Sequence, residues 1–166
     1  MKRSYIQRGK KKLGRSKTPH KVYEEYLDQL WRTIVRLRDK GLNQYALSQG
    51  IEKPGVDCHH IFSRKLRNTR WDTRNGILVM GLHNYHEPHV HPIKFHEWLR
   101  NSWFKAPIEY DMLKVRSELI GVQIDRSAME IALTQELMTL TKLSFDWYTL
   151  SFNKKKKYLL TLRKEI

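Results

Sequence analysis

The sequence lacks the residues and runs that define several classes of protein. Its 166 residues include one cysteine, Cys58, so neither an internal disulfide nor a cysteine-rich zinc cluster can form. No apolar run approaches the roughly 18 residues needed to cross a membrane, and no apolar segment follows the basic N-terminus as in a signal peptide. These features predict a soluble, cytoplasmic protein without a membrane partner.

Acidic residues are also scarce. Lys and Arg number 32 against 17 Asp and Glu, which gives a formal net charge of +15. Residues 1–21 hold nine of the basic residues and no acid. Such an excess favours a polyanionic partner, nucleic acid above all, with an anionic membrane surface or a merely soluble basic protein as the alternatives. We expect 1–21 to be a flexible basic arm whose Lys10, Lys11 and Lys12 neutralise phosphates, with a solubilising tail as the alternative.

The spacing of apolar residues predicts a mostly helical chain. Between residues 23 and 40 they recur at steps of three and four, which indicates an amphipathic helix that ends before Gly41. Further helices are predicted at residues 92–104, at 107–121 and after Asp125. The helices of the extension 105–166 are expected either to pack on the preceding part or to form a surface for a second copy or another partner.

Two short strands interrupt the helical pattern. Residues 56–62 follow a Pro-Gly turn signal, and residues 76–80 are rich in apolar and β-branched side chains. The polar loop between them is basic, and five of its side chains are predicted to contact DNA: Arg64, Lys65, Arg67, Arg70 and Arg74. With the helix that follows, the two strands make a compact strand-strand-helix unit.

Histidines gather around this unit. Seven of the eight lie within residues 56–99. Histidine is the commonest transition-metal ligand and has a pKa near neutrality, so the cluster indicates a metal or acid-base site. Chance clustering of surface histidines is the alternative. Because successive side chains of a strand point to opposite faces, His59 and His60 are expected to do different work.

These residues resemble the HNH endonuclease family, whose ββα-metal fold is named after a His, an Asn and a second His. The matching positions are the pair His59-His60 before Ile, Asn75 before Gly-Ile-Leu, and His83 before Asn. The motifs RWD-x-x-NGI and PIKFHEWL look like the version common in bacteriophage genomes. The resemblance covers about residues 22–99. It implies an α+β, mostly helical fold, with a ββα-metal unit in a nuclease domain 22–104 and a helical extension beyond it.

The resemblance also implies an activity and roles for residues. The chain would hydrolyse DNA with one divalent metal ion, Mg²⁺ or Mn²⁺. His60 matches the general base that takes a proton from the attacking water, and His59 matches a metal ligand. Asn75 matches the central Asn, which in some members orients the base and in others touches the metal. His83 matches the final His, a metal ligand or a phosphate contact.

The last metal ligand stays open. Glu87 is four residues after His83, on the same helical face, and its carboxylate suits Mg²⁺ or Mn²⁺. His86 and Asp57 are the competing choices. The other histidines are expected to lie near phosphate, at His89 and His91, or to be structural, at His96.

The sequence departs from many family members, which hold a structural zinc with two CxxC pairs. The second pair falls on Val79 and Leu82 here, and the first near residues 43 and 46, so no structural zinc is expected. Packing by Tyr45, Leu47, Val79 and Leu82 is expected instead. The alternative function is a DNA-binding or interaction protein on a degenerate HNH scaffold, and the form of the DNA is open.

Overall fold

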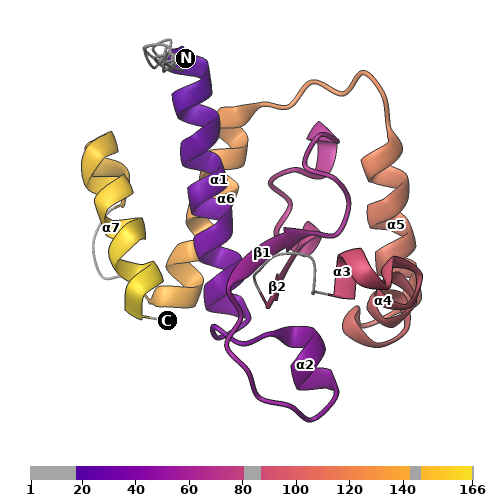
Figure 1. The fold of residues 1–166 in the computed structure, drawn as a ribbon. Coiled ribbons are helices and arrows are strands. Elements are labelled where there is room, and N and C mark those ends of the chain that lie inside the picture. The colour runs from indigo at the N-terminus through magenta and orange to yellow at the C-terminus, as the bar shows by residue number, and fades with distance from the viewer. Residues whose placement is uncertain (1–17, 81–86, 143–146, 166) are drawn as a thin grey trace, which may run out of the picture.

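The computed structural model describes residues 18–80, 87–142 and 147–165, apart from the side chain of Glu87. The fold is α+β and mostly helical, as predicted, with one two-stranded antiparallel sheet (Figure 1). The helices and strands in chain order are α1 (Pro19–Arg38), α2 (Gln44–Ser48), β1 (Asp57–His60), β2 (Gly76–Val79), α3 (Glu87–Val90), α4 (Pro92–Trp98), α5 (Pro107–Glu118), α6 (Arg126–Thr141) and α7 (Phe152–Glu165).

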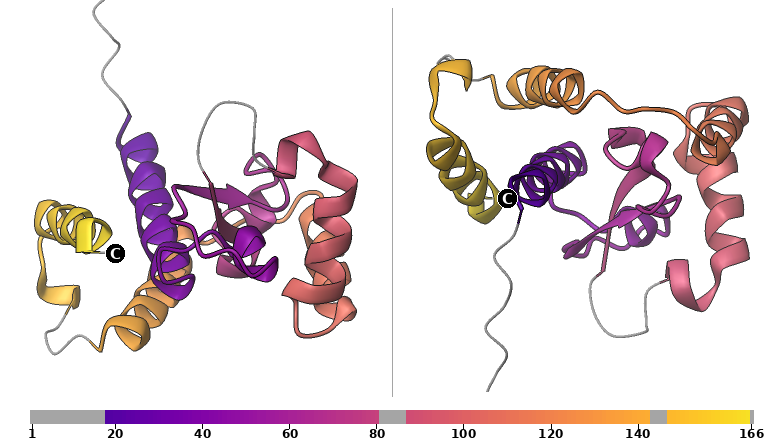
Figure 2. Two further views of the ribbon diagram at one scale, coloured as in Figure 1. Left: turned by 60° about the horizontal axis from the view of Figure 1, so that its bottom comes forward. Right: turned by 90° about the horizontal axis from the view of Figure 1, so that it is seen from above.

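The helix α1 is the central element of the molecule. Thr18 caps its first turn, and Pro19 occupies its first position, where the N–H that proline lacks would have no hydrogen-bond partner within the helix. The predicted apolar face is buried, with Leu27, Leu30 and Trp31 fully excluded from solvent. In Figure 2, α1 lies between the C-terminal helices on one side and the hairpin on the other.

The hairpin matches the two predicted strands. β1 and β2 pair antiparallel, with His59 opposite Ile77 and His60 opposite Gly76. The basic loop between the strands contains two short 3-10 turns, at Arg67–Thr69 and Thr73–Asn75. All of β2 is buried, whereas β1 is partly exposed, so β1 is the strand that can present side chains to a ligand.

The C-terminal end of α1 fixes the hairpin. The guanidinium of Arg38 donates to the carbonyls of Thr73 and Gly76, and the buried carboxylate of Asp39 accepts from the N–H of Leu78 at 2.7 Å. At Gly76, an added Cβ would lie 2.5 Å from Trp31 and from Val35. Only glycine therefore lets β2 begin this close to α1.

Two apolar cores flank the hairpin. The larger joins α1 to the C-terminal helices through Leu133, Leu137, Trp147 and Leu159. The helices α6 and α7 of the extension therefore pack on the preceding part of the chain. Asp125 caps α6 as predicted, because its carboxylate accepts from the N–H groups of residues 127 and 128.

The smaller core lies between the hairpin and the segment from α4 to α5. It contains Ile77, Val79 and Phe95, with Tyr45 packed against it. The prediction for Leu47 was wrong, since it is 41% exposed on the short helix α2. Leu82 lies outside the described residues.

The single helix predicted at 92–104 is α4 continued by a π-helical turn, Leu99–Trp103. No described helix has the length and apolar character to span a bilayer.

Candidate active site

The two adjacent histidines of β1 face opposite sides of the hairpin, as strand alternation requires. The ring of His60 stacks on the indole of Trp31 from α1, with centroids 4.0 Å apart and planes 9° from parallel. The ring of His59 faces α3 and α4, where it meets His89 edge-on at 5.5 Å and Phe95 at 6.0 Å. The two imidazoles therefore have separate surroundings and can serve separate purposes.

A single hydrogen bond determines which nitrogen of His60 can accept a proton. Nε2 lies 3.0 Å from the backbone carbonyl oxygen of Arg70. A carbonyl oxygen can only accept, so Nε2 must carry the hydrogen, and the lone pair of the neutral ring is on Nδ1. The carbonyl also increases the electron density of the ring, as the partner of a catalytic histidine does. His60 is thus oriented with one basic nitrogen.

Burial keeps His60 neutral. It lowers the pKa of the imidazole to about 4, because a charged ring beside Trp31 loses solvation. The Arg70 carbonyl and the charge of Asp28 raise the pKa, and both effects are smaller than that of burial. The ring is therefore an available proton acceptor at neutral pH, although a weaker one than imidazole in water.

Asn75 holds the loop that supplies the carbonyl. Its side chain is fully buried, and its Oδ1 accepts from the N–H of Phe62 at 2.7 Å. Its Nδ2 donates to the carbonyls of Phe62 at 3.0 Å and Thr69 at 2.9 Å. The amide thus ties Phe62, two residues after β1, to Thr69, the residue before Arg70. Of the two roles open to Asn75, this geometry supports orientation of the base.

Arg70 is fixed by its side chain as well. Its Nε and Nη2 donate to the two carboxylate oxygens of Asp28 at 3.0 and 2.7 Å, and Nη1 lies 3.4 Å from Glu24. Its guanidinium also lies over the ring of Trp71, whose N–H donates to Asp28 at 2.8 Å. The guanidinium was predicted to contact DNA. In the structure the guanidinium is hydrogen-bonded to Asp28 and Glu24, and the contact with DNA stays a prediction.

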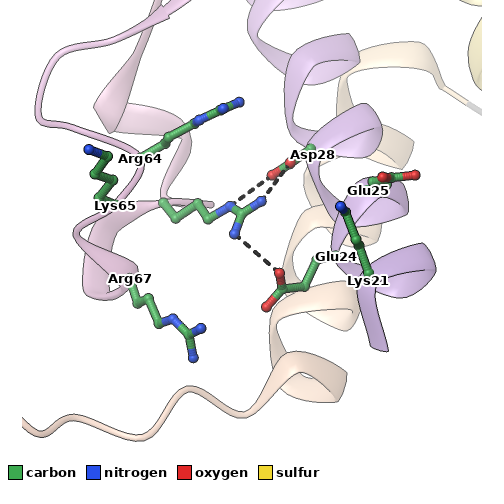
Figure 3. Close-up of a pocket in the computed structure, with 8 residues that line it drawn as sticks. Lys21, Glu24, Glu25, Asp28, Arg64, Lys65 and Arg67 are labelled. Carbon is green, nitrogen blue, oxygen red and sulfur yellow. Dashed lines mark hydrogen bonds and ion pairs between the residues drawn. The ribbon is translucent and has the colours of Figure 1, made fainter. Parts of the chain in front are cut away.

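The remaining basic side chains of the loop are exposed. Arg64, Lys65 and Arg67 form the basic wall of a cleft of about 450 Å³, whose other wall is the acidic start of α1 (Figure 3). These three side chains have no ion pair within 18–80, 87–142 or 147–165. Arg74 is 62% exposed and pairs with Asp72 at 2.8 Å. Of the five basic side chains of the loop, Arg70 and Arg74 are thus in ion pairs, and the other three have none with the described residues.

The predicted metal site is described only in part. Of its ligands, His59 lies in the described chain, whereas His83 and the side chain of Glu87 lie outside it, as do Lys10, Lys11 and Lys12 of the arm. Among the described residues, no group of three His, Cys, Asp or Glu could hold a metal ion. His59 and His89 are brought together, and two imidazoles suit a divalent transition metal.

The sequence did not reveal four contributors to the site. Trp31 and Asp28 appeared only as part of the helix, although their spacing of three places them on one face. His89 was expected near phosphate, and its ring lies beside His59. No sequence signal identifies the Arg70 carbonyl, because every residue has one.

No protein-family model, curated protein or solved structure matches this chain.

Proposed function

We propose that this protein is a metal-dependent DNA endonuclease in which His60 is the general base. The hydrogen bond from Nε2 of His60 to the Arg70 carbonyl carries the proposal, because it leaves Nδ1 as the one proton acceptor of a neutral ring. The hairpin supports the proposal as well. The buried amide of Asn75 joins the chain just after His60, at Phe62, to the chain just before Arg70, at Thr69.

In the proposed reaction, Nδ1 of His60 takes a proton from the water that attacks the phosphorus, and the bond from phosphorus to the leaving oxygen of the DNA breaks. The proton then resides on an imidazolium that the Arg70 carbonyl stabilises through Nε2. An anionic phosphate beside the ring would raise the pKa of His60, since a nearby negative charge favours the charged imidazolium. Substrate binding would thus bring the base closer to the pKa that suits catalysis at neutral pH.

His59 is the proposed metal ligand on the opposite face of β1. A bound Mg²⁺ or Mn²⁺ would neutralise charge on the phosphate and stabilise the leaving oxygen. His83 and Glu87 remain the proposed partners of His59, and the position of His89 adds a third candidate. A histidine-rich set favours Mn²⁺ or another transition metal, whereas the Glu87 carboxylate is the ligand that suits Mg²⁺.

The loop connects substrate binding to the base. The carbonyl that orients His60 belongs to Arg70, only a few residues after Arg64, Lys65 and Arg67. Phosphates bound by these side chains would therefore lie on the segment that positions the base. Such contacts carry no sequence information, so we propose weak sequence specificity. Lys10, Lys11 and Lys12 of the arm are proposed to add affinity in the same way.

Cleavage of DNA tests the proposal. Supercoiled, linear and branched DNA are incubated with the wild type and a series of divalent metals, and nicking is followed on gels. His60→Ala should lower the rate roughly 10²- to 10⁴-fold, the usual contribution of a general base. His20→Ala, at an exposed histidine of α1, is the control and should cleave normally.

Two results would contradict the proposal. One is full activity of a folded His60→Ala variant. The other is salt-sensitive DNA binding by the wild type without cleavage under any divalent metal, which would identify a DNA-binding protein on a degenerate scaffold.

A further inference from the structure

The helix α5 has two apolar faces, and only one of them is buried. Tyr110, Leu113 and Ser117 face the interior, next to the smaller core and the loop. On the other side, apolar residues recur at steps of three and four with much of their surface exposed: Ile108 61%, Met112 65%, Val115 61% and Leu119 53%. This spacing makes a continuous stripe along the outer side of the helix.

The stripe extends beyond the end of α5. Ile120 is 98% exposed and Val122 is 50% exposed in the segment that leads to α6. Soluble monomers seldom expose a contiguous apolar patch of more than a few hundred Å², and larger ones mark interaction sites. Six exposed apolar side chains within residues 108–122 are therefore unusual for a free surface. In Figure 1, α5 lies at the edge of the molecule remote from α7, where a partner has access.

The charges beside the stripe indicate what that partner is. Glu109 and Arg116 are seven residues apart, which is two helical turns, so both lie on the same flank of the stripe. When two copies of α5 pack antiparallel, this flank meets itself. Glu109 of each copy then lies opposite Arg116 of the other, and two equivalent ion pairs form.

The other flank carries Asp111 and Glu118, which are both acidic. The axis that sets Glu109 opposite Arg116 also sets Asp111 level with Lys114 of the other copy, which offsets part of the repulsion between the carboxylates. Asp111 forms an ion pair with Arg100 at 2.8 Å, so the guanidinium would neutralise this carboxylate at the interface. On the first flank, Nη1 of Arg116 lies 2.9 Å from Asp72 of its own chain, so in the dimer its guanidinium would be shared between Asp72 and Glu109 of the other copy.

We propose that the chain forms a homodimer in which the α5 stripes of two copies pack antiparallel about a twofold axis. A twofold interface must be complementary to itself, and the stripe meets this requirement in both its apolar centre and its Glu109–Arg116 flank. DNA is a poor occupant for the stripe because its centre is apolar. The dimer does not depend on the nuclease activity, so either proposal can fail alone.

Sedimentation velocity across micromolar concentrations tests the dimer. The wild type should sediment as a dimer, and Met112→Glu should give monomers by placing two like charges at the axis. Ile131→Glu on α6, where a similar apolar side chain is 48% exposed, is the matched control and should leave the dimer intact. Circular dichroism checks that each variant is folded.

A mixing experiment tests the antiparallel geometry itself. Glu109→Arg alone sets Arg opposite Arg116, and Arg116→Glu alone sets Glu opposite Glu109, so each should dissociate. An equal mixture of the two variants should form heterodimers, because each flank again joins opposite charges. A wild type that stays monomeric, or a mixture of folded variants that stays monomeric, would overturn the proposal. Both outcomes can be read whether or not the protein cleaves DNA.

Discussion

The carboxylate of Asp28 holds the guanidinium of Arg70 through two hydrogen bonds, at 3.0 and 2.7 Å. The carbonyl of the same arginine accepts the hydrogen bond that orients His60. A residue in the middle of α1 is thereby connected to the proposed base without touching it. If His60 is the base, we expect Asp28 to act as a positioning residue, whose effect on catalysis should differ from its effect on DNA binding.

Asp28→Asn should slow cleavage roughly tenfold, less than loss of the base itself, because the carbonyl of Arg70 is then less firmly placed. Removing a negative charge beside the basic loop should at the same time strengthen DNA binding. The two effects are separated by measuring kcat and Kd. Glu25→Gln, which removes a carboxylate from the same cleft (Figure 3), is the control and should affect only binding. Equal kcat in both variants would contradict the positioning role.

Asn75→Ala should destabilise the fold by about 3 kcal/mol. The change leaves one N–H and two carbonyl groups of the loop without the buried amide, and each unsatisfied buried group costs about 1–3 kcal/mol unless water replaces it. Urea unfolding measures the loss. Asn101→Ala, at an exposed asparagine, should change stability by less than about 0.5 kcal/mol. An unfolding curve for Asn75→Ala that matches the wild type would refute the account of the loop.

Stability should depend on pH through His60. Its pKa is about 4 in the folded protein and near 6.5 in the unfolded chain, so below pH 6.5 the unfolded chain binds the proton more readily. The free energy of unfolding should therefore fall as the pH drops from about 6.5 to about 4, by up to roughly 3 kcal/mol. His60→Phe keeps an aromatic ring beside Trp31 and should remove this part of the dependence. Parallel pH curves for the two proteins would contradict the assignment.

Replacing Arg64, Lys65 and Arg67 by Gln should weaken DNA binding and reduce its salt dependence. If each side chain neutralises one phosphate, the slope of log affinity against log salt should decrease by about 3.

A control for this experiment removes three charges from elsewhere. Lys154, Lys157 and Lys164 are exposed on α7, on the other side of α1 from the hairpin (Figure 1). Their triple Gln variant should keep the wild-type slope. If the α7 variant loses the slope instead, the lysine run of residues 154–157 is the DNA-binding surface.

Periodicity in the sequence was enough to predict the parts of the site that depend on local geometry. The opposite orientations of His59 and His60 follow from strand alternation, and the hairpin follows from two apolar runs with turn signals. Arg70 shows where this reasoning stops. An arginine in a basic loop is predicted to bind phosphate, and only tertiary structure brings Asp28, 42 residues earlier, to its guanidinium.

Leu47 and Trp31 illustrate the same limit in the cores. Leu47 is an apolar residue that was expected in the core and is exposed. Trp31 is a core residue of α1 that also stacks on the ring of His60. Spacing along the chain identifies which side of a helix is apolar. It does not identify what that side will meet, because the partner is chosen by contacts distant in sequence.

The shared core of α1 and the C-terminal helices limits how this site can be moved between proteins. Residues 56–99 contain the histidines, but the ring that covers His60 and the carboxylate that holds Arg70 belong to α1. That helix is in turn buried against α6 and α7. Grafted into another protein without α1, the hairpin would carry its histidines and lose the surroundings that give His60 its tautomer and its pKa. The transplantable unit is therefore nearly the whole described chain.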